Sequence, residues 1–152
     1  MDKILSAVSA LGGQRSDIVR TRVYLTNQDH CESVSRVHGR YFEGLNPANT
    51  MIEVSNLIGD HLVEIEAEAI VDEDKSMKQE KQKRTHIFSG STFEELAGYS
   101  RAVVVGDHIY VSGTVGINFQ TGKLPEDAAG QAEQALDTIE KALHQAQSGL
   151  HD

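Results

Sequence analysis

Basic residues, cysteines and long apolar stretches are scarce in this chain, and each shortage excludes a class of protein. Fourteen Lys and Arg stand against 23 Asp and Glu, a formal charge of -9, which argues against binding to nucleic acid or anionic membranes because both need cations that neutralise phosphates. No apolar run approaches the roughly 20 residues that span a bilayer, and no charged-then-apolar leader follows Met1. We therefore expect a cytoplasmic protein, with no membrane partner, whose partner is a small molecule or another copy of itself.

Patterns typical of disulfide, metal and phosphate sites are also missing. Cys31 is the only cysteine, so no intramolecular disulfide can form, and its place on an apolar helix face predicts a structural thiol. The histidines never place two ligands on one helix face, and the glycines near 106–116 precede no helix N-terminus that could cradle a phosphate. We expect no metal and no cofactor. The histidines are His30, His38, His61, His86, His108, His144 and His151.

The first part of the chain alternates helical and strand periodicity. At 152 residues the chain has the length of one domain. Residues 18–25 place Val19, Thr21, Val23 and Leu25 on one face of a strand. The expected elements are a helix over 4–11 stopped by Gly12-Gly13, the strand 18–25, a helix over 31–42, and strands over 51–54 and 62–71.

A charged segment separates this part from a second one. Nine of the thirteen residues from Asp72 to Arg84 are charged, a composition typical of a solvated connector. After it, Ala102–Val105 and His108–Ser112 predict a hairpin with Gly106-Asp107 at the turn. A strand near 115–117 and a long helix over Asp127–Gln147 follow, and the helix stripe is expected to contain Ala132, Ala135, Leu136, Ile139, Ala142, Leu143 and Ala146.

The end of the chain repeats its beginning. At a constant offset of 135 positions, Asp2, Ile4, Ala7 and Asp17 match Asp137, Ile139, Ala142 and Asp152. Both copies are amphipathic, and the first runs directly into the strand at 18–25. We expect the longer second copy to fill the helix position of the fold, because it buries more apolar area, and the first copy to be displaced.

Read from position 85 to the end and then from the beginning, the chain resembles the RidA/YjgF family. Each motif is short, and their joint order and spacing carry the resemblance. The matching segments are Gly98–Val103, Val111–Gly113, Gln131–Ala142, Asp17–Thr21, Asn46–Thr50 and Val63–Ala67. Family members usually begin with the half that here comes second. The resemblance therefore predicts one circularly permuted domain over 1–152, in which 1–71 corresponds to the family's C-terminal half, 72–84 is the linker, and 85–152 corresponds to the N-terminal half.

The family resemblance implies an α+β fold and a class of activity. The fold is similar to that of chorismate mutase, with a mixed sheet packed by two helices, and it assembles into a homotrimeric barrel with ligand clefts between subunits. Relatives deaminate reactive imine or enamine metabolites, hydrolysing the imine to a keto acid and ammonia without a cofactor. An arginine after the family's proline-alanine pair holds the substrate carboxylate, since a guanidinium matches a carboxylate bidentately.

In this chain Asn49 stands at the arginine position, which predicts an altered choice of substrate. An amide carries no charge, so about 1.5 to 3 kcal/mol of charge-assisted hydrogen bonding is missing. The resemblance assigns catalytic roles to Glu64, Tyr99 and Ser112, where Glu64 holds or polarises a water as general base. Ligand-binding roles fall to Asn49, Thr50, Gly113 and Arg101. Arg101 shares a strand face with Tyr99, and Arg20 shares one with Arg22, so either set is a candidate replacement cation.

Each candidate residue also has a purely structural interpretation, and two other functions remain open. Glu64, Glu66 and Glu68 can form an ordinary polar strand face that needs water or cationic partners, Tyr99 can be packing, and Asn49 can be a turn residue after Pro47. One alternative function is a noncatalytic metabolite-binding module. The other is a ribonuclease or translation inhibitor, which the acidic balance disfavours.

Overall fold

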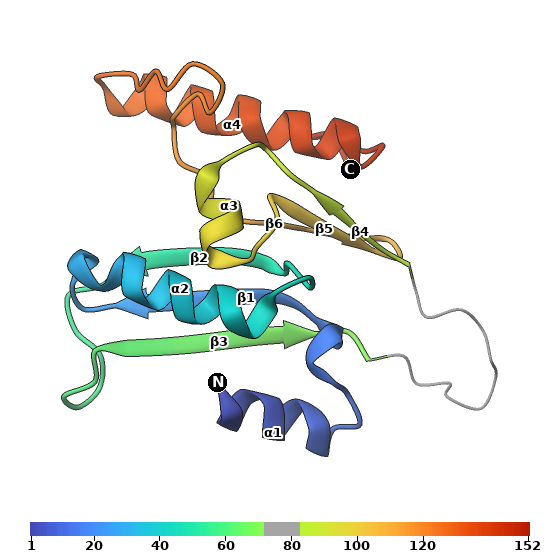
Figure 1. Cartoon of the computed structure of the whole chain (residues 1–152). Coiled ribbons are helices and arrows are strands. Elements are labelled where there is room, and N and C mark those ends of the chain that lie inside the picture. The colour runs from blue at the N-terminus through green and yellow to red at the C-terminus, as the bar shows by residue number, and fades with distance from the viewer. Residues whose placement is uncertain (72–82) are drawn as a thin grey trace.

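A computed structural model describes residues 1–71 and 83–152, which we call the first half and the second half (Figure 1). Most of the expected connector lies outside the described residues. Arg84, which the sequence assigned to the connector, is instead the first residue of a strand. None of the helices in the two described ranges is long and apolar enough to cross a bilayer.

The first half is a three-stranded mixed sheet with two helices. The strands run in the order β2 (Ala48–Glu53), β1 (Ile18–Leu25), β3 (Val63–Ala69), and the helices are α1 (Asp2–Ala10) and α2 (Cys31–Phe42). β1 is parallel to β2 and antiparallel to β3. The expected alternation of β1 is confirmed, because Val19, Thr21, Val23 and Leu25 are buried and the intervening residues are half-buried.

The second half is a three-stranded antiparallel sheet with two helices. The strands run in the order β4 (Arg84–Ile87), β5 (Ala102–Val105), β6 (His108–Val111), with α3 (Thr92–Ala97) and α4 (Ala128–Gln145). The β5–β6 hairpin forms as expected, and Gly106 takes the positive φ of +55° that its turn requires. Ala142 of α4 packs with Ile87 and Ala102 of the sheet.

The two halves meet along a seam, which we define as the contact of residues 46–50 with residues 97–113. An isolated parallel bridge joins Ala48 to Ser100, and Gly113 N donates to Asn49 O at 3.0 Å. One buried cluster contains Val19 and Ala48 from the first half and Val103 and Val105 from the second. Because strands of both halves share this core, the fold is α+β with a mixed arrangement of strands, as expected.

The repeat seen in the sequence is also a repeat of backbone structure. α1 ends at Ala10 and α4 ends at Gln145, again 135 positions apart. The bonds that close the first helix recur in the second: Leu11 N to Ala7 O matches Ala146 N to Ala142 O, Gly12 N to Ser9 O matches Gln147 N to His144 O, and Gly13 N to Val8 O matches Ser148 N to Leu143 O. The aspartate caps recur as well, since Asp17 Oδ2 accepts from Gln14 N and Asp152 Oδ2 accepts from Gly149 N.

The two copies differ in packing, as their lengths predict. α4 covers the second sheet, whereas α1 buries no residue and lies beside β3 at the opposite end of the molecule (Figure 1). A nine-residue helix has too little apolar area to compete with the eighteen-residue copy.

Three sequence expectations are wrong in detail. No strand forms at 115–117, where Val115 is exposed and Gly116 packs against the backbone of Gln131. The sequence predicts an apolar stripe on α2 made of Cys31, Val34, Val37, Tyr41 and Phe42, but Ser35 and His38 turn inward with Phe42, while Val37 is exposed. α4 buries Thr138 and Ala142, while Leu136 is exposed. Polar partners from distant segments, which periodicity does not reveal, account for the inward Ser35 and His38.

Candidate functional site

A cavity of about 240 Å³ lies at the seam, between α2 with β2 on one side and the second half on the other. We call it the seam cavity. It brings together four of the seven predicted site residues, namely Asn49, Tyr99, Arg101 and Gly113. The remaining lining residues are Cys31, Ser35, Met51, Ser91, Phe93, Ala97, Val115 and Phe119.

Arg101 is the charged group of this cavity. The residue is 1% exposed, and its Nη1 donates to Gly113 O at 2.8 Å and to Thr114 Oγ1 at 3.1 Å. Its Nη2 donates to the Tyr99 hydroxyl at 3.3 Å. A guanidinium has two N–H groups on Nη2, so one of them has no partner among the described residues. The guanidinium carbon also lies 5.7 Å from the ring centre of Tyr99 and 5.4 Å from that of Phe119, within cation–π range.

Glu94 of α3 balances the charge of Arg101. Its Oε1 lies 3.5 Å from Arg101 Nε. The carboxylate also accepts from Ser89 N, Ser89 Oγ and Gly90 N, at 2.7 to 3.1 Å. These donors hold the Glu94 carboxylate in place beside Arg101 Nε. The Nη2 side of Arg101 faces Tyr99 instead. Buried ion pairs persist only when such additional bonds satisfy them.

Tyr99 contributes a hydroxyl that remains protonated. Burial raises the pKa of this phenol, and the nearby Arg101 opposes the shift only in part. The hydroxyl accepts from Arg101, also interacts with the Ser91 side chain, and keeps its own proton. Tyr99 and Arg101 therefore present two hydrogen-bond donors beside each other.

Asn49 is held in a buried chain of hydrogen bonds. Its Nδ2 donates to Thr21 Oγ1 at 2.9 Å, and Thr21 Oγ1 lies 2.8 Å from His38 Nε2. His38 Nδ1 lies 2.5 Å from Ala97 O, which can only accept, so Nδ1 carries the proton and Nε2 accepts from Thr21. Burial lowers the pKa of His38, which favours this neutral form. The Nδ2 group of Asn49 thus takes part in a hydrogen-bond network of the fold, although the residue borders the cavity.

Hydrogen bonds of Ser112, Thr50 and Gly113 join the two halves at the seam. Ser112 Oγ donates to Ser100 O at 2.6 Å and accepts from Asn49 N at 2.8 Å, so its proton is already used. Gly113 N donates to both Asn49 O and Thr50 Oγ1 at 3.0 Å. A Cβ on Gly113 would lie 2.9 Å from Thr50 Cγ2, so the close approach of the halves requires glycine here. The structure places Ser112 and Thr50 at the joint between the halves rather than in the lining of the cavity.

Glu64 lies apart from the cavity. It is exposed on β3 opposite Tyr24, on the sheet face that also presents Arg22. The expected cationic partner of the acidic row is confirmed for its neighbours, because Arg22 pairs with Glu66 at 3.3 Å and with Glu68 at 2.7 Å. Glu64 has no hydrogen bond or ion pair within the described ranges. No carboxylate or imidazole from these ranges lines the seam cavity.

Several residues of the site escaped the sequence analysis. The signal for His38 is its spacing from Ser35 and Phe42, which places all three on the inward face of α2. Phe93, Phe119 and Glu94 come from segments with no helical or strand period around them, and only the folded chain brings them to Arg101. Cys31 is half-buried at the cavity, with Sγ 3.6 Å from Met51 Sδ.

No group of three or more His, Cys, Asp or Glu side chains in the described parts of the chain is arranged to hold a metal ion. Arg101 and Tyr99 are the residues able to bind a ligand through charge and hydrogen bonds, while Phe93, Met51 and Phe119 supply apolar walls. The arrangement suits a small ligand with one anionic end.

Comparison with known families identifies the class of protein. The model of the family described as Endoribonuclease L-PSP matches residues 1–71 and 90–152. The chain belongs to this family, and the resemblance to RidA/YjgF proteins is confirmed.

Each curated relative matches slightly less than half of the chain. Protein DfrA of Myxococcus xanthus is 36% identical over 70 residues, covering 46% of this chain and 53% of the relative. The RutC family protein UK114 of Drosophila melanogaster is 37% identical over 68 residues, covering 44% of this chain and 49% of the relative. The chain spans about half the length of the curated relatives it matches.

Solved structures extend the comparison to the whole fold. A YjgF/YER057c/UK114 family member from Mycobacterium tuberculosis is 39% identical, with a TM-score of 0.45, covering 46% of this chain and 60% of that one. A chorismatase is 17% identical with a TM-score of 0.59, covering 93% of this chain and 46% of that one. The second likeness concerns the fold alone, and it extends over both halves.

Proposed function

We propose that this protein binds a small carboxylate-bearing molecule in the seam cavity, with the carboxylate held by Arg101 and Tyr99. The observation that carries the proposal is the unpaired N–H on Arg101 Nη2 beside the Tyr99 hydroxyl. These two donors are suited to the two oxygens of one carboxylate. Arg101 thereby replaces the cation that is missing at Asn49.

The chemistry of the cavity favours binding without turnover. Hydrolysis of an imine adds water across C=N and releases ammonia and a keto acid, so a base must take a proton from the water. The described lining contains no such base, and the Asn49 amide and the Ser112 hydroxyl are both used by the fold. A noncatalytic metabolite-binding module is therefore our leading function.

Imine or enamine hydrolysis is the second candidate, and Tyr99 is the observation that favours it. A phenol whose pKa is raised by burial keeps the proton that a departing amine needs. Hydrolysis would require a neighbouring copy to supply the base, and Glu64 on its exposed strand face is the candidate. A homotrimer, as the family resemblance implies, is part of this second proposal.

The domain organisation stays a proposal as well. We infer one permuted RidA-like domain over 1–152, in which 1–71 and 85–152 are the family's two halves in exchanged order and 72–84 joins them. The buried cluster shared by Val19, Ala48, Val103 and Val105 supports it.

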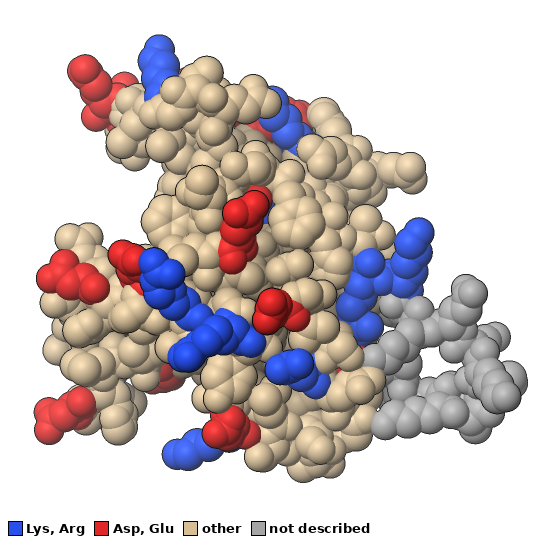
Figure 2. All heavy atoms as spheres, viewed as in Figure 1, with Lys and Arg blue, Asp and Glu red and all other residues tan. Residues whose placement is uncertain are grey.

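RNA is disfavoured as a partner. The formal charge is -9, and Figure 2 shows acidic and basic side chains interspersed on the face in view, without a continuous basic stripe. RNA binding relies on many cations that neutralise phosphates.

One paired experiment separates the two candidates. Pyruvate, as a simple 2-oxo acid, is titrated while the Arg101 Nε–H signal is followed by NMR, and ammonia release is measured from freshly generated 2-iminopropanoate. A binding module shifts the Arg101 signal and releases no ammonia above the protein-free rate. Release that Glu64→Ala abolishes, with the pyruvate shift unchanged, would establish hydrolysis instead. No shift with pyruvate would reject the proposed ligand class.

A further inference from the structure

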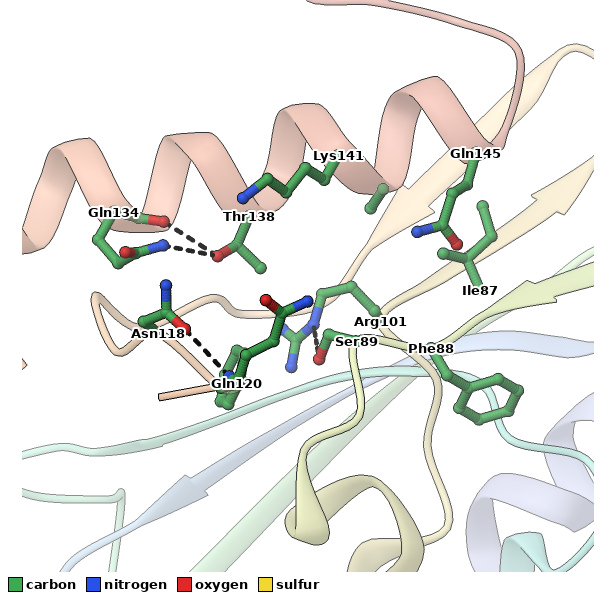
Figure 3. Close-up of a pocket in the computed structure, with 12 residues that line it drawn as sticks. Ile87, Phe88, Ser89, Arg101, Asn118, Gln120, Gln134, Thr138, Lys141 and Gln145 are labelled. Carbon is green, nitrogen blue, oxygen red and sulfur yellow. Dashed lines mark hydrogen bonds between the residues drawn. The ribbon is translucent and has the colours of Figure 1, made fainter. Parts of the chain in front are cut away.

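A second cavity, also of about 240 Å³, lies between α4 and the turn at residues 118–121 (Figure 3). We call it the α4 cavity. It shares Arg101 and Phe119 with the seam cavity but has a different lining. The other lining residues are Ile87, Phe88, Ser89, Asn118, Gln120, Gln134, Thr138, Lys141, Ala142 and Gln145.

α4 turns a polar face toward this cavity. Gln134, Thr138, Lys141 and Gln145 follow each other at steps of four, three and four residues, which places them on one side of the helix. Figure 3 shows this side facing the sheet, while Leu136 is 54% exposed. Ala142 and Ala146 of the same helix pack against the sheet, as the apolar side of a helix normally does, so the polar side chains lie beside this contact.

Three side-chain amides at the cavity have groups that form no hydrogen bond with a described residue. Asn118 Oδ1 accepts from Gln120 N and Thr121 N, both at 3.0 Å. Its Nδ2 has no hydrogen-bond partner among the described residues. The amides of Gln120 and Gln145 likewise have no hydrogen bond with a described residue. Figure 3 shows the three amides around the same opening. Together they offer donors and acceptors from two sides, the turn and α4.

The charges at this cavity are balanced. Lys141 Nζ lies 2.6 Å from Asp137 Oδ2, and Arg101 Nε lies 3.5 Å from Glu94 Oε1. Lys141 Nζ and Arg101 Nε are therefore already paired with carboxylates. The unpaired groups are neutral amides, which both donate and accept, as hydroxyl groups do.

We propose that the α4 cavity binds a neutral polyhydroxylated molecule of about one ring, such as a monosaccharide or a cyclitol. The hydroxyls pair with the amides of Asn118, Gln120 and Gln145, and the C–H face packs on the apolar surface of Ile87, Phe119 and Ala142. A cavity of about 240 Å³ is smaller than the pockets that hold drug-sized ligands. The site shares Arg101 and Phe119 with the seam cavity, but the proposal does not rest on carboxylate binding there.

The test uses D-glucose and myo-inositol as probes with the whole chain. Side-chain amide signals of Gln120 and Gln145 are followed by NMR during titration, and we expect both to shift with a dissociation constant on the order of 1 mM for at least one probe. Gln145→Leu should weaken that binding at least about tenfold. Gln28→Leu, the same change at an exposed position before α2, should leave it unaltered.

Specific results would overturn the proposal. One is that the amide signals of Gln120 and Gln145 do not shift with either probe up to about 50 mM, and another is that Gln145→Leu and the parent protein bind the probe equally well. A shift of the same amide signals with pyruvate in place of the sugars would also contradict the proposal. Concentration-dependent broadening of these amide signals without any probe would also overturn it, because a second copy would then occupy the polar face. The Gln145→Leu variant should still bind pyruvate, which separates this site from the seam cavity.

Discussion

His38 on α2 donates from Nδ1 to Ala97 O at the end of α3, a distance of 2.5 Å across the seam. The bond between Thr21 Oγ1 and His38 Nε2 requires the neutral ring, because Nε2 can accept only while it carries no proton. Burial lowers the pKa of His38, and it also lowers the pKa of the half-buried His86, whose Nδ1 lies 3.1 Å from Asn46 O. The junction of the two halves is therefore sensitive to acid.

The first prediction concerns the dependence of stability on pH. A lowered pKa means that the unfolded chain binds more protons than the folded one below about pH 6.5, so the free energy of unfolding falls as the solution is acidified. Urea unfolding between about pH 7.5 and 5 measures the slope. His38→Gln should reduce the slope, and His144→Gln, an exposed position on α4, should not. An unchanged slope in His38→Gln would contradict the account of the seam.

The second prediction concerns Gly113. In Gly113→Ala the new Cβ meets Thr50 Cγ2 at 2.9 Å and Oγ1 at 3.1 Å, so the halves must separate slightly, at a cost of about 1–3 kcal/mol. Denaturant unfolding measures the loss. Gly149→Ala, where the Cβ meets nothing within 4 Å, is the matched control. The double variant Gly113→Ala, Thr50→Ala should recover part of the lost free energy of unfolding. If the free-energy changes of the two single variants simply add, the contact between the two side chains does not affect stability.

The third prediction tests the single permuted domain. Val19 and Val103 are 0% and 1% exposed and belong to one cluster although they lie in different halves. Val19→Ala and Val103→Ala should each lower the same unfolding transition by about 2–3 kcal/mol. Circular dichroism and tyrosine fluorescence should then report coincident transitions. Two separate transitions, each moved by only one of the variants, would mean that the halves fold independently.

The fourth prediction concerns the hydroxyl of Tyr99. Tyr99→Phe removes one of the two proposed donors to the carboxylate and leaves the ring beside Arg101. Pyruvate binding should weaken by about 0.5–1.5 kcal/mol, roughly two- to tenfold. Tyr110→Phe makes the same change outside the seam cavity and should bind as the parent does. Equal affinity of the two variants for pyruvate would show that the Tyr99 hydroxyl does not bind the carboxylate.

The elements of the fold could largely be predicted from the sequence, because local periodicity decides them. The alternation of Val19, Thr21, Val23 and Leu25 was sufficient to predict β1. The two copies of the repeated helix also end at equivalent residues, 135 positions apart. The prediction of a strand at 115–117 was wrong, because a short apolar run says little about whether a strand or another structure forms.

The site was predictable only in part. Tyr99, Arg101 and Gly113 were identified through motifs, and the structure brings them to one cavity. The roles of His38 and Glu94 were not predictable, since each depends on partners 59 and 7 positions away that the fold alone brings into contact. The polar residues of α4 at the cavity were missed because helix stripes were assigned by hydrophobicity, and here Gln134 and Thr138 line the cavity beside Ala142, which packs on the sheet.

The most direct test of the central claim is calorimetric titration of pyruvate into the parent protein, Arg101→Lys and Arg36→Lys. Arg36 is an exposed arginine paired with Glu32 on α2, so its replacement should leave binding unchanged. Arg101→Lys keeps the charge next to Glu94 but loses the planar fork, and circular dichroism verifies its fold. We predict at least about tenfold weaker binding for Arg101→Lys alone. Equal affinity of all three proteins would contradict the assignment of Arg101 as the carboxylate-binding residue.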